Sequence, residues 1–262
     1  MRARILSLAA LTLSACQGEP TPAPLEPQEP QAEPAPEPDP TAVDANAPAT
    51  WPLVVELDFT SAEQLTHFAF SDDAGWRWSE VEGALELHAR CDYAPPHRSP
   101  HGIALLSAWE LGAFDIEFEV RQSGREYGHR DLCFFTGFQG PASYYYTHLA
   151  TTPDDHANNV FVVDEAPRVR LCEVPAEGTQ WGDDGSWHTV RLERRLDPPR
   201  FSVYFDGGAE PVLETEDARF ARGRVGFGSF DDTGLLRSLR IWSPDATASD
   251  AASPFAGEAG GE

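Results

Sequence analysis

A strictly alternating segment in the middle of the chain limits the folds that this sequence can adopt. In residues 114–120 (FDIEFEV), apolar side chains occupy every second position, and Asp115, Glu117 and Glu119 lie between them. A period of two places alternate side chains on opposite faces of a β-strand and does not match the 3.6-residue period of a helix. The segment is therefore predicted to be a strand with one face toward a core and the other toward solvent.

Similar strand-length runs recur along the chain, separated by turn sequences such as 182–185 (GDDG) and 206–208 (DGG). The other expected strands are residues 53–59, 84–90, 103–106, 132–138, 144–149, 160–163, 168–172, 188–194, 201–205, 224–230 and 235–242, and Trp76 and Trp78 are expected to share one face of a further strand. Only residues 62–68 are expected to form a short helix, with Ser61 as its N-cap. Since the spacing leaves no room for helices between strands, we expect an all-β domain over residues 51–243, a two-sheet antiparallel sandwich.

The charge of the chain excludes two classes of function. Asp and Glu total 43 against 19 Lys and Arg, which gives a net charge of −24. Binding driven by phosphate contacts needs a basic surface, so a nucleic-acid partner is not expected. A polybasic membrane-surface role is excluded for the same reason.

The first sixteen residues have the layout of a secretory signal. Arg2 and Arg4 give a positive start, residues 5–13 form an apolar run, and small residues precede Cys16. An apolar run of this length is too short for a mature transmembrane helix. Residues 1–15 are therefore expected to be removed from the mature protein.

The end of this segment, residues 13–16 (LSAC), resembles the bacterial lipobox. The resemblance implies a lipoprotein that is anchored to a membrane by acyl chains such as palmitate on Cys16. The alternative is an ordinary signal peptide with an incidental cysteine. Gln17 is not the aspartate that marks inner-membrane retention in enteric bacteria. We therefore expect a cell-envelope protein on the outer membrane of a Gram-negative bacterium.

Two segments that flank the expected domain lack the apolar residues of a core. Residues 17–50 contain ten prolines, seven acidic residues and no basic residue. This composition predicts an extended, disordered tether, which together with the lipidated cysteine spans residues 16–50. Residues 244–262 are rich in Ala, Gly, Ser and Asp and are expected to be a disordered tail.

Three cysteines remain after Cys16, namely Cys91, Cys133 and Cys172. In an oxidising compartment an odd number permits at most one bridge within the chain. We expect a Cys133–Cys172 bridge because both residues lie in strand-like runs, with buried free thiols as the alternative.

The order of motifs in the second half of the chain resembles concanavalin A-like lectin/glucanase jelly rolls, which include laminin-G-like modules. The motifs are 185–191 (GSWHTVR), 201–207 (FSVYFDG), 223–228 (GRVGFG) and 239–242 (LRIW). Within that superfamily, four further stretches resemble bacterial 3-keto-disaccharide hydrolase-type domains: 93–100 (YAPPHRSP), 131–139 (DLCFFTGFQ), 144–149 (YYYTHL) and 156–161 (HANNVF). The resemblance implies a jelly-roll sandwich and a carbohydrate ligand in the cell envelope. It leaves the activity open, because such folds serve as enzymes, lectins and adhesion modules.

One row of side chains suits a saccharide. Tyr144, Tyr146 and His148 alternate on one face of an expected strand, and Asp131 begins the preceding strand. Aromatic rings stack on the C–H faces of sugars, and Asp131 could orient the ligand or His148. The alternative is that the tyrosines are ordinary sheet residues with high β propensity. Further candidate ligand contacts are Tyr93 and Arg98 on a proline-rich loop, Asn158, and Trp181 in a Gly/Asp loop.

A polar cluster follows this row. Asp154, Asp155, Asn158 and Asn159 offer oxygen ligands of the type that Ca²⁺ prefers, so a calcium cofactor is a candidate. An Asp/Asn-rich turn explains the same residues without a metal.

Three hypotheses for function follow. The first is a carbohydrate-binding, lectin-like module. The second is an enzyme that acts on modified saccharides by hydrolysis or lyase chemistry, with His148 or His156 as base and Asp131 orienting it. The third is a non-catalytic adhesion or structural module.

Overall fold

The computed structural model describes residues 51–175, 177–183 and 185–255. The expected signal peptide, Cys16 and the tether lie outside the described residues. In the described ranges, no helix has the length and apolar character needed to cross a membrane.

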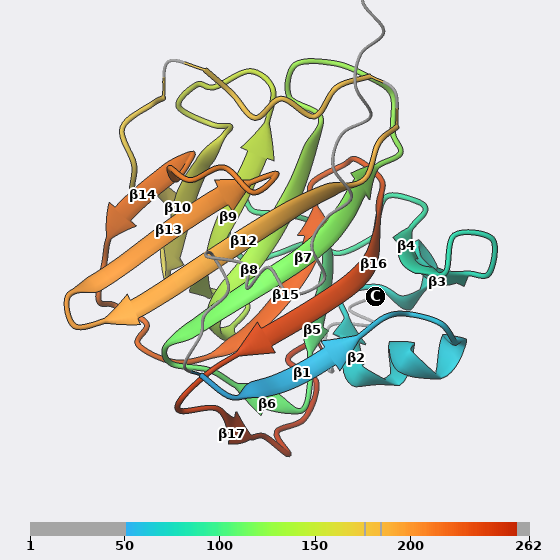
Figure 1. Ribbon diagram of the computed structural model, residues 1–262, viewed down its shortest axis with the longest axis horizontal. Coiled ribbons are helices and arrows are strands. Elements are labelled where there is room, and N and C mark those ends of the chain that lie inside the picture. Colours follow the sequence, from blue (N-terminus) through green and yellow to red (C-terminus); the bar gives the residue numbers. More distant parts are fainter. Residues whose placement is uncertain (1–50, 176, 184, 256–262) are drawn as a thin grey trace, which may run out of the picture. The chain divides into compact units, whose positions relative to one another are not determined.

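Two large antiparallel sheets face one another, as Figure 1 shows. The eight-stranded sheet contains β14 (Leu213–Glu216), β13 (Pro199–Phe205), β12 (His188–Leu196), β7 (Phe114–Gln122), β16 (Gly234–Trp242), β4 (Ala84–Leu87) and β3 (Trp76–Ser79) in that order, with β1 (Leu53–Leu57) also paired to β16. The seven-stranded sheet has the order β11 (Val169–Arg170), β10 (Asn159–Asp164), β9 (Ser143–Ala150), β8 (Asp131–Gly140), β15 (Arg224–Ser229), β5 (Gly102–Leu106) and β2 (Phe68–Phe70). The predicted all-β, two-sheet antiparallel sandwich is confirmed.

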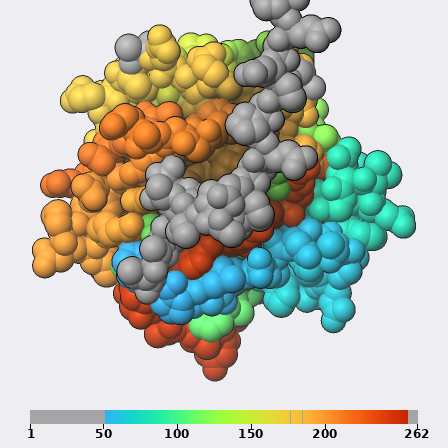
Figure 2. All heavy atoms as spheres, viewed as in Figure 1, coloured from blue at the N-terminus to red at the C-terminus, as the bar shows by residue number. Residues whose placement is uncertain are grey.

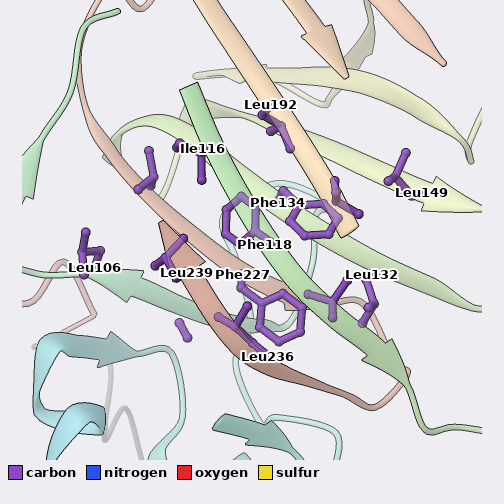
Figure 3. Packing of buried hydrophobic residues seen from close by; sticks show 14 of the residues in the cluster. Leu106, Ile116, Phe118, Leu132, Phe134, Leu149, Leu192, Phe227, Leu236 and Leu239 are labelled. Carbon is purple, nitrogen blue, oxygen red and sulfur yellow. The ribbon is translucent and has the colours of Figure 1, made fainter. Parts of the chain in front are cut away.

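The alternating segment forms β7, between β12 and β16. Its apolar side chains enter the core between the sheets, and its acidic side chains pair with arginines of neighbouring strands on the outer face. Figure 3 shows Phe118 of β7 beside Phe134 and Phe227 of the opposite sheet. The ring centroids of Phe118 and Phe134 are 4.8 Å apart. Aromatic packing between the sheets therefore holds the sandwich together.

The central strands of the seven-stranded sheet are buried on both faces. On β9, Tyr145 and Leu149 belong to the core between the sheets, whereas Tyr144 and Tyr146 belong to a second apolar cluster. The strand residues of this second cluster come from β5, β8, β9 and β10 alone, so the cluster lies on the outer face of the sheet. A sequence such as 132–138 (LCFFTGF) is nearly continuously apolar because neither face meets water.

Short elements complete the fold. Two further short strands, β6 (Trp109–Glu110) and β17 (Thr247–Ala248), pair with each other. The expected helix is a 3₁₀ helix, η1 (Ala62–His67), and a second one, η2, covers Asp73–Gly75. Ser61 is the N-cap residue of η1, as predicted, although its side chain makes no capping hydrogen bond.

The segment expected to be a disordered tail contacts the sandwich over much of its length. The Asp245 carboxylate accepts hydrogen bonds from the backbone of Gly112 at 3.1 Å and Ala113 at 3.3 Å. Farther along, the Phe255 ring packs edge-on against Tyr93 at 5.4 Å. Residues 245–255 are thus attached by hydrogen bonds and ring contacts that the Ala/Gly/Ser-rich composition did not predict.

The predicted Cys133–Cys172 bridge is wrong. Cys91, Cys133 and Cys172 are all buried free thiols. Cys133 lies in the outer-face cluster and Cys172 in the core between the sheets. Because the sheet separates the two side chains, they cannot meet.

Candidate functional site

A groove of about 930 Å³ lies at the β2 edge of the seven-stranded sheet. It is bordered by β2, by η2 and by two segments, residues 92–94 and residues 251–255. Its lining combines four aromatic rings with carboxylates and hydroxyls: Phe68, Phe70, Tyr93, Phe255, Asp72, Asp73, Asp92, Ser71, Ser107 and Ser253. This combination of rings and hydrogen-bonding groups is typical of a small-ligand site.

The aromatic walls are fixed by packing. Phe68 and Phe70 lie two residues apart on the edge strand β2, with ring centroids 6.3 Å apart. Phe70 also contacts Trp76 at 5.4 Å. On the other side, Tyr93 is held by the edge-on contact with Phe255. Because Phe68 and Tyr93 are each only 7% exposed, the half-buried rings of Phe70 and Phe255 are the aromatic groups that this groove offers to a ligand.

The carboxylates in the groove fall into two kinds. Asp72 is structural, because its oxygens accept hydrogen bonds from the backbone of Ala74 at 3.0 Å and of Asp92 at 2.8 Å. These bonds tie η2 to the segment 92–94. Asp73 and Asp92 are exposed, and within the described ranges neither carboxylate has a hydrogen-bond or ion-pair partner. Two carboxylates are thus free to accept hydrogen bonds from a ligand.

The row expected to stack on sugars lies beneath other parts of the chain. Tyr144, Tyr146 and His148 share one face of β9, but their exposed fractions are 0%, 0% and 5%. Arg168 donates a hydrogen bond to the Tyr146 hydroxyl at 2.6 Å and lies over the Phe161 ring at 4.6 Å. The tyrosines therefore pack as part of the outer-face cluster and present no open ring face.

Asp131 and His148 meet, as the sequence predicts. The Asp131 Oδ2 and His148 Nε2 atoms are 3.7 Å apart, and both side chains are buried. Sequence reasoning missed Cys133, whose thiol donates to Asp131 Oδ2 at 2.9 Å. The spacing of two residues on β8, which places Asp131 and Cys133 on one face, was the available signal. Ser229 of β15 completes the cluster with a hydrogen bond to Asp131 Oδ1 at 2.9 Å.

Burial controls protonation in this cluster. It raises the pKa of Asp131 to about 7 and, with a smaller contribution from Arg168, lowers the pKa of His148 to about 3. It also raises the pKa of the Cys133 thiol well above its usual range. A buried charge is unfavourable without compensation, so the imidazole and the thiol are neutral near pH 7.

Asp131, Cys133 and His148 form the one group of metal-ligand type among the described residues. Carboxylate, thiolate and imidazole together suit Zn²⁺. However, the Asn158 backbone N–H donates to His148 Nδ1 at 3.2 Å, so the neutral ring carries its proton on Nε2. Nε2 faces Asp131 and therefore offers no lone pair to a metal there. The three side chains fit a hydrogen-bonded network better than a metal site.

The side chains of the expected calcium cluster are engaged separately. Asp154 lies near His129, Asp155 near Arg170, Asn158 bonds to Thr179 and Asn159 to Cys172. The two asparagine oxygens already accept backbone or hydroxyl hydrogen bonds inside the protein. These bonds are those of structural turns and strand ends, as the turn alternative predicts.

The remaining candidates divide between core and surface. Trp181 is only 2% exposed and packs edge-on against the ring of His188, so it offers no stacking face. Arg98 and His156 are exposed on loops. Tyr93 is the one expected ligand contact that lines the groove. Phe255 could have been noticed as the one aromatic residue in the expected tail.

Comparison with known proteins extends the description of the fold. No family profile matches the chain, and no curated protein sequence matches it. Among solved structures, it is similar to the carbohydrate binding module CBM66 from Bacillus subtilis, with 16% identity over 68% of this chain and 96% of that chain, and a TM-score of 0.50. It is also similar to the GH43 protein BlXynB from Bacillus licheniformis, with 12% identity over 74% of this chain and 40% of that chain, and a TM-score of 0.53.

These similarities concern the fold. The chain shares a two-sheet jelly-roll sandwich fold with these two proteins, in agreement with the fold that its motifs predict. The chain spans less than half of the length of the GH43 protein. The similarity therefore does not assign the activity of that whole enzyme to this chain. At these identities the fold alone is shared.

Proposed function

We propose that this protein is a carbohydrate-binding module whose site is the groove at the β2 edge. The observation that carries the proposal is that the half-buried rings of Phe70 and Phe255 line one groove with the carboxylates of Asp73 and Asp92, for which the described residues supply no partner. Rings stack on the C–H faces of a sugar, while carboxylates accept its hydroxyl hydrogen bonds. The fold supports the proposal, because the similar Bacillus subtilis domain is a carbohydrate binding module.

The hydrolase alternative, suggested by resemblance to 3-keto-disaccharide hydrolase-type domains, has less support. Asp131, which was expected to orient the base, and His148, one of the two expected bases, lie under the cover that includes Arg168, whereas His156, the other expected base, is exposed on a loop. A catalytic base must come within hydrogen-bond reach of its substrate, and this pair is out of reach while covered.

Replacing Phe70 with leucine is expected to weaken retention on the preferred immobilised polysaccharide about tenfold, or about 1.4 kcal/mol. Leucine keeps apolar volume against Trp76 but removes the flat ring face, so the melting temperature should change little. Phe255→Leu should act in the same direction from the opposite wall. Affinity electrophoresis through a panel of polysaccharides measures both.

The matched control is Tyr204→Leu, on β13 of the other sheet, where the ring contacts Arg191. This variant should be retained like the wild type. Unchanged retention of both phenylalanine variants would place the binding site elsewhere. Failure of the wild type to bind any polysaccharide would favour the adhesion module.

We also propose that the protein is a cell-envelope lipoprotein acylated on Cys16 and sorted to the outer membrane. The proposal rests on the sequence of residues 1–17. In a Gram-negative host grown with a labelled palmitate analogue, the wild type should become labelled and Cys16→Ser should not. Label that persists in Cys16→Ser would contradict the proposal, as would absence of label in the wild type.

A further inference from the structure

The groove carries negative charge without a compensating cation. Asp72, Asp73 and Asp92 contribute to its lining, and no arginine or histidine is among the lining residues that the structure describes. Asp72 is engaged with backbone N–H groups, but hydrogen bonds of this kind leave its charge in place. A ligand in the groove therefore meets three carboxylates.

Two arginines on neighbouring segments are committed elsewhere, and Arg98, which is exposed on the loop that follows residues 92–94, is not among the lining residues. Arg224 donates to the backbone carbonyls of Ala251 and Ala252 and lines a separate hollow. Arg90 pairs with Asp231 at 2.7 Å. Neither side chain is available in the groove to neutralise an acidic ligand.

Other arginines lie on the outer face of the eight-stranded sheet, which is the sheet nearer the viewer in Figure 1 and in Figure 2. There Arg240 pairs with Glu117 and Arg237 pairs with Glu119, across neighbouring strands. Glu117 and Glu119 on that face are therefore paired with arginines, whereas no arginine is among the described residues that line the groove.

We propose that the groove binds uncharged saccharide chains and excludes acidic ones, such as those with uronic acid or sulfate groups. This inference rests on the proposed function and specifies the class of saccharide that the groove binds. Neutral hydroxyls can donate to Asp73 and Asp92, whereas a carboxylate or sulfate would only be repelled. Repulsion is strengthened where groove walls partly exclude water, and like charges across an interface suppress wrong partners.

The test compares one polymer in two charge states. The neutral polysaccharide that the wild type retains is run beside its carboxymethyl derivative, at low and at high salt. We expect at least tenfold weaker retention of the carboxymethyl polymer at low salt, with a smaller difference at high salt because of screening. Equal retention of both polymers would overturn the inference and leave the proposed function standing. Absence of retention of the neutral polymer would instead overturn the proposed function.

The net charge of −24 could repel acidic polymers without any contribution from the groove, so a second variant pair separates the two causes. Asp73→Asn with Asp92→Asn should raise the ratio of acidic to neutral retention at least fivefold. Asp164→Asn with Glu216→Gln removes the same charge from exposed sites on β10 and β14 and should leave this ratio unchanged. An equal rise in both double variants would overturn the assignment of selectivity to the groove.

Discussion

Gly228→Ala is expected to lower the free energy of unfolding by more than about 3 kcal/mol, a larger effect than most core substitutions. Gly228 lies on β15, between β8 and β5. A β-carbon at this position would stand 1.9 Å from the carbonyl oxygen of Gly102 on β5. That oxygen belongs to the backbone of a paired strand, so it cannot move aside without separating the strands.

Thermal unfolding followed by circular dichroism measures this effect. A loss of about 3 kcal/mol corresponds to a decrease in melting temperature of roughly 6–12 °C for a domain of this size. The matched control is Gly140→Ala at the end of β8, where an added β-carbon has no neighbour within 4 Å. The control should melt close to the wild type. A Gly228→Ala protein that melts within about 2 °C of the wild type would contradict the close approach of β15 to β5.

The second large effect is expected in the pH dependence of stability when one member of the Asp131–His148 pair is removed. Burial raises the pKa of Asp131 from its ordinary value of 3.8 to about 7. Burial also lowers the pKa of His148 from 6.5 to about 3. Between about pH 4 and 6.5, the folded protein therefore holds a proton on Asp131, whereas the unfolded chain holds one on His148. Since both states bind one proton, the pair adds no slope to wild-type stability in this range.

In each single variant, the group that remains should make the free energy of unfolding depend on pH. In Asp131→Asn, only the unfolded chain takes up a proton, on His148, so stability should fall as the pH falls from about 6.5 toward 3. In His148→Gln, only the folded protein takes up a proton, on Asp131, so stability should rise as the pH falls from about 7 toward 4. Each slope is at most about 1.4 kcal/mol per pH unit relative to the wild type.

Urea unfolding at several pH values measures these slopes, and the double variant is the control. Asp131→Asn combined with His148→Gln removes both groups and should return the slope to that of the wild type. Stability curves of both single variants that run parallel to the wild type would show that the two groups titrate normally in the folded protein.

The strands could be predicted because their signal is local. Each expected strand has a counterpart in the structure, and the alternation in β7 correctly separates its core face from its outer face. The short strands β2, β6, β14 and β17 were missed because two to four residues carry too little periodicity. In the same way, the apolar run of β8 predicted a strand but not that both of its faces are covered.

The candidate site could be predicted only in part. The meeting of Asp131 with His148 follows from the adjacency of consecutive strands β8 and β9. Ser229 joins them because β15 pairs with β8, a pairing between segments far apart in the chain. The contact between Tyr93 and Phe255 at the groove likewise joins segments that are far apart in the chain.

The sequence by itself determined the all-β class, the antiparallel sandwich, the positions of the long strands and the acidic net charge of the chain. These properties follow from the two-residue period and from composition, which are carried by neighbouring residues in the chain. Only the tertiary structure decided that the Tyr144/Tyr146/His148 row is covered, that Cys133 and Cys172 stay apart, and that a groove opens beside β2. Those outcomes depend on which loop packs on which face of a sheet. The residue pattern of a single strand does not record this, because it is the same whether the outer face of the strand meets water or the C-terminal segment.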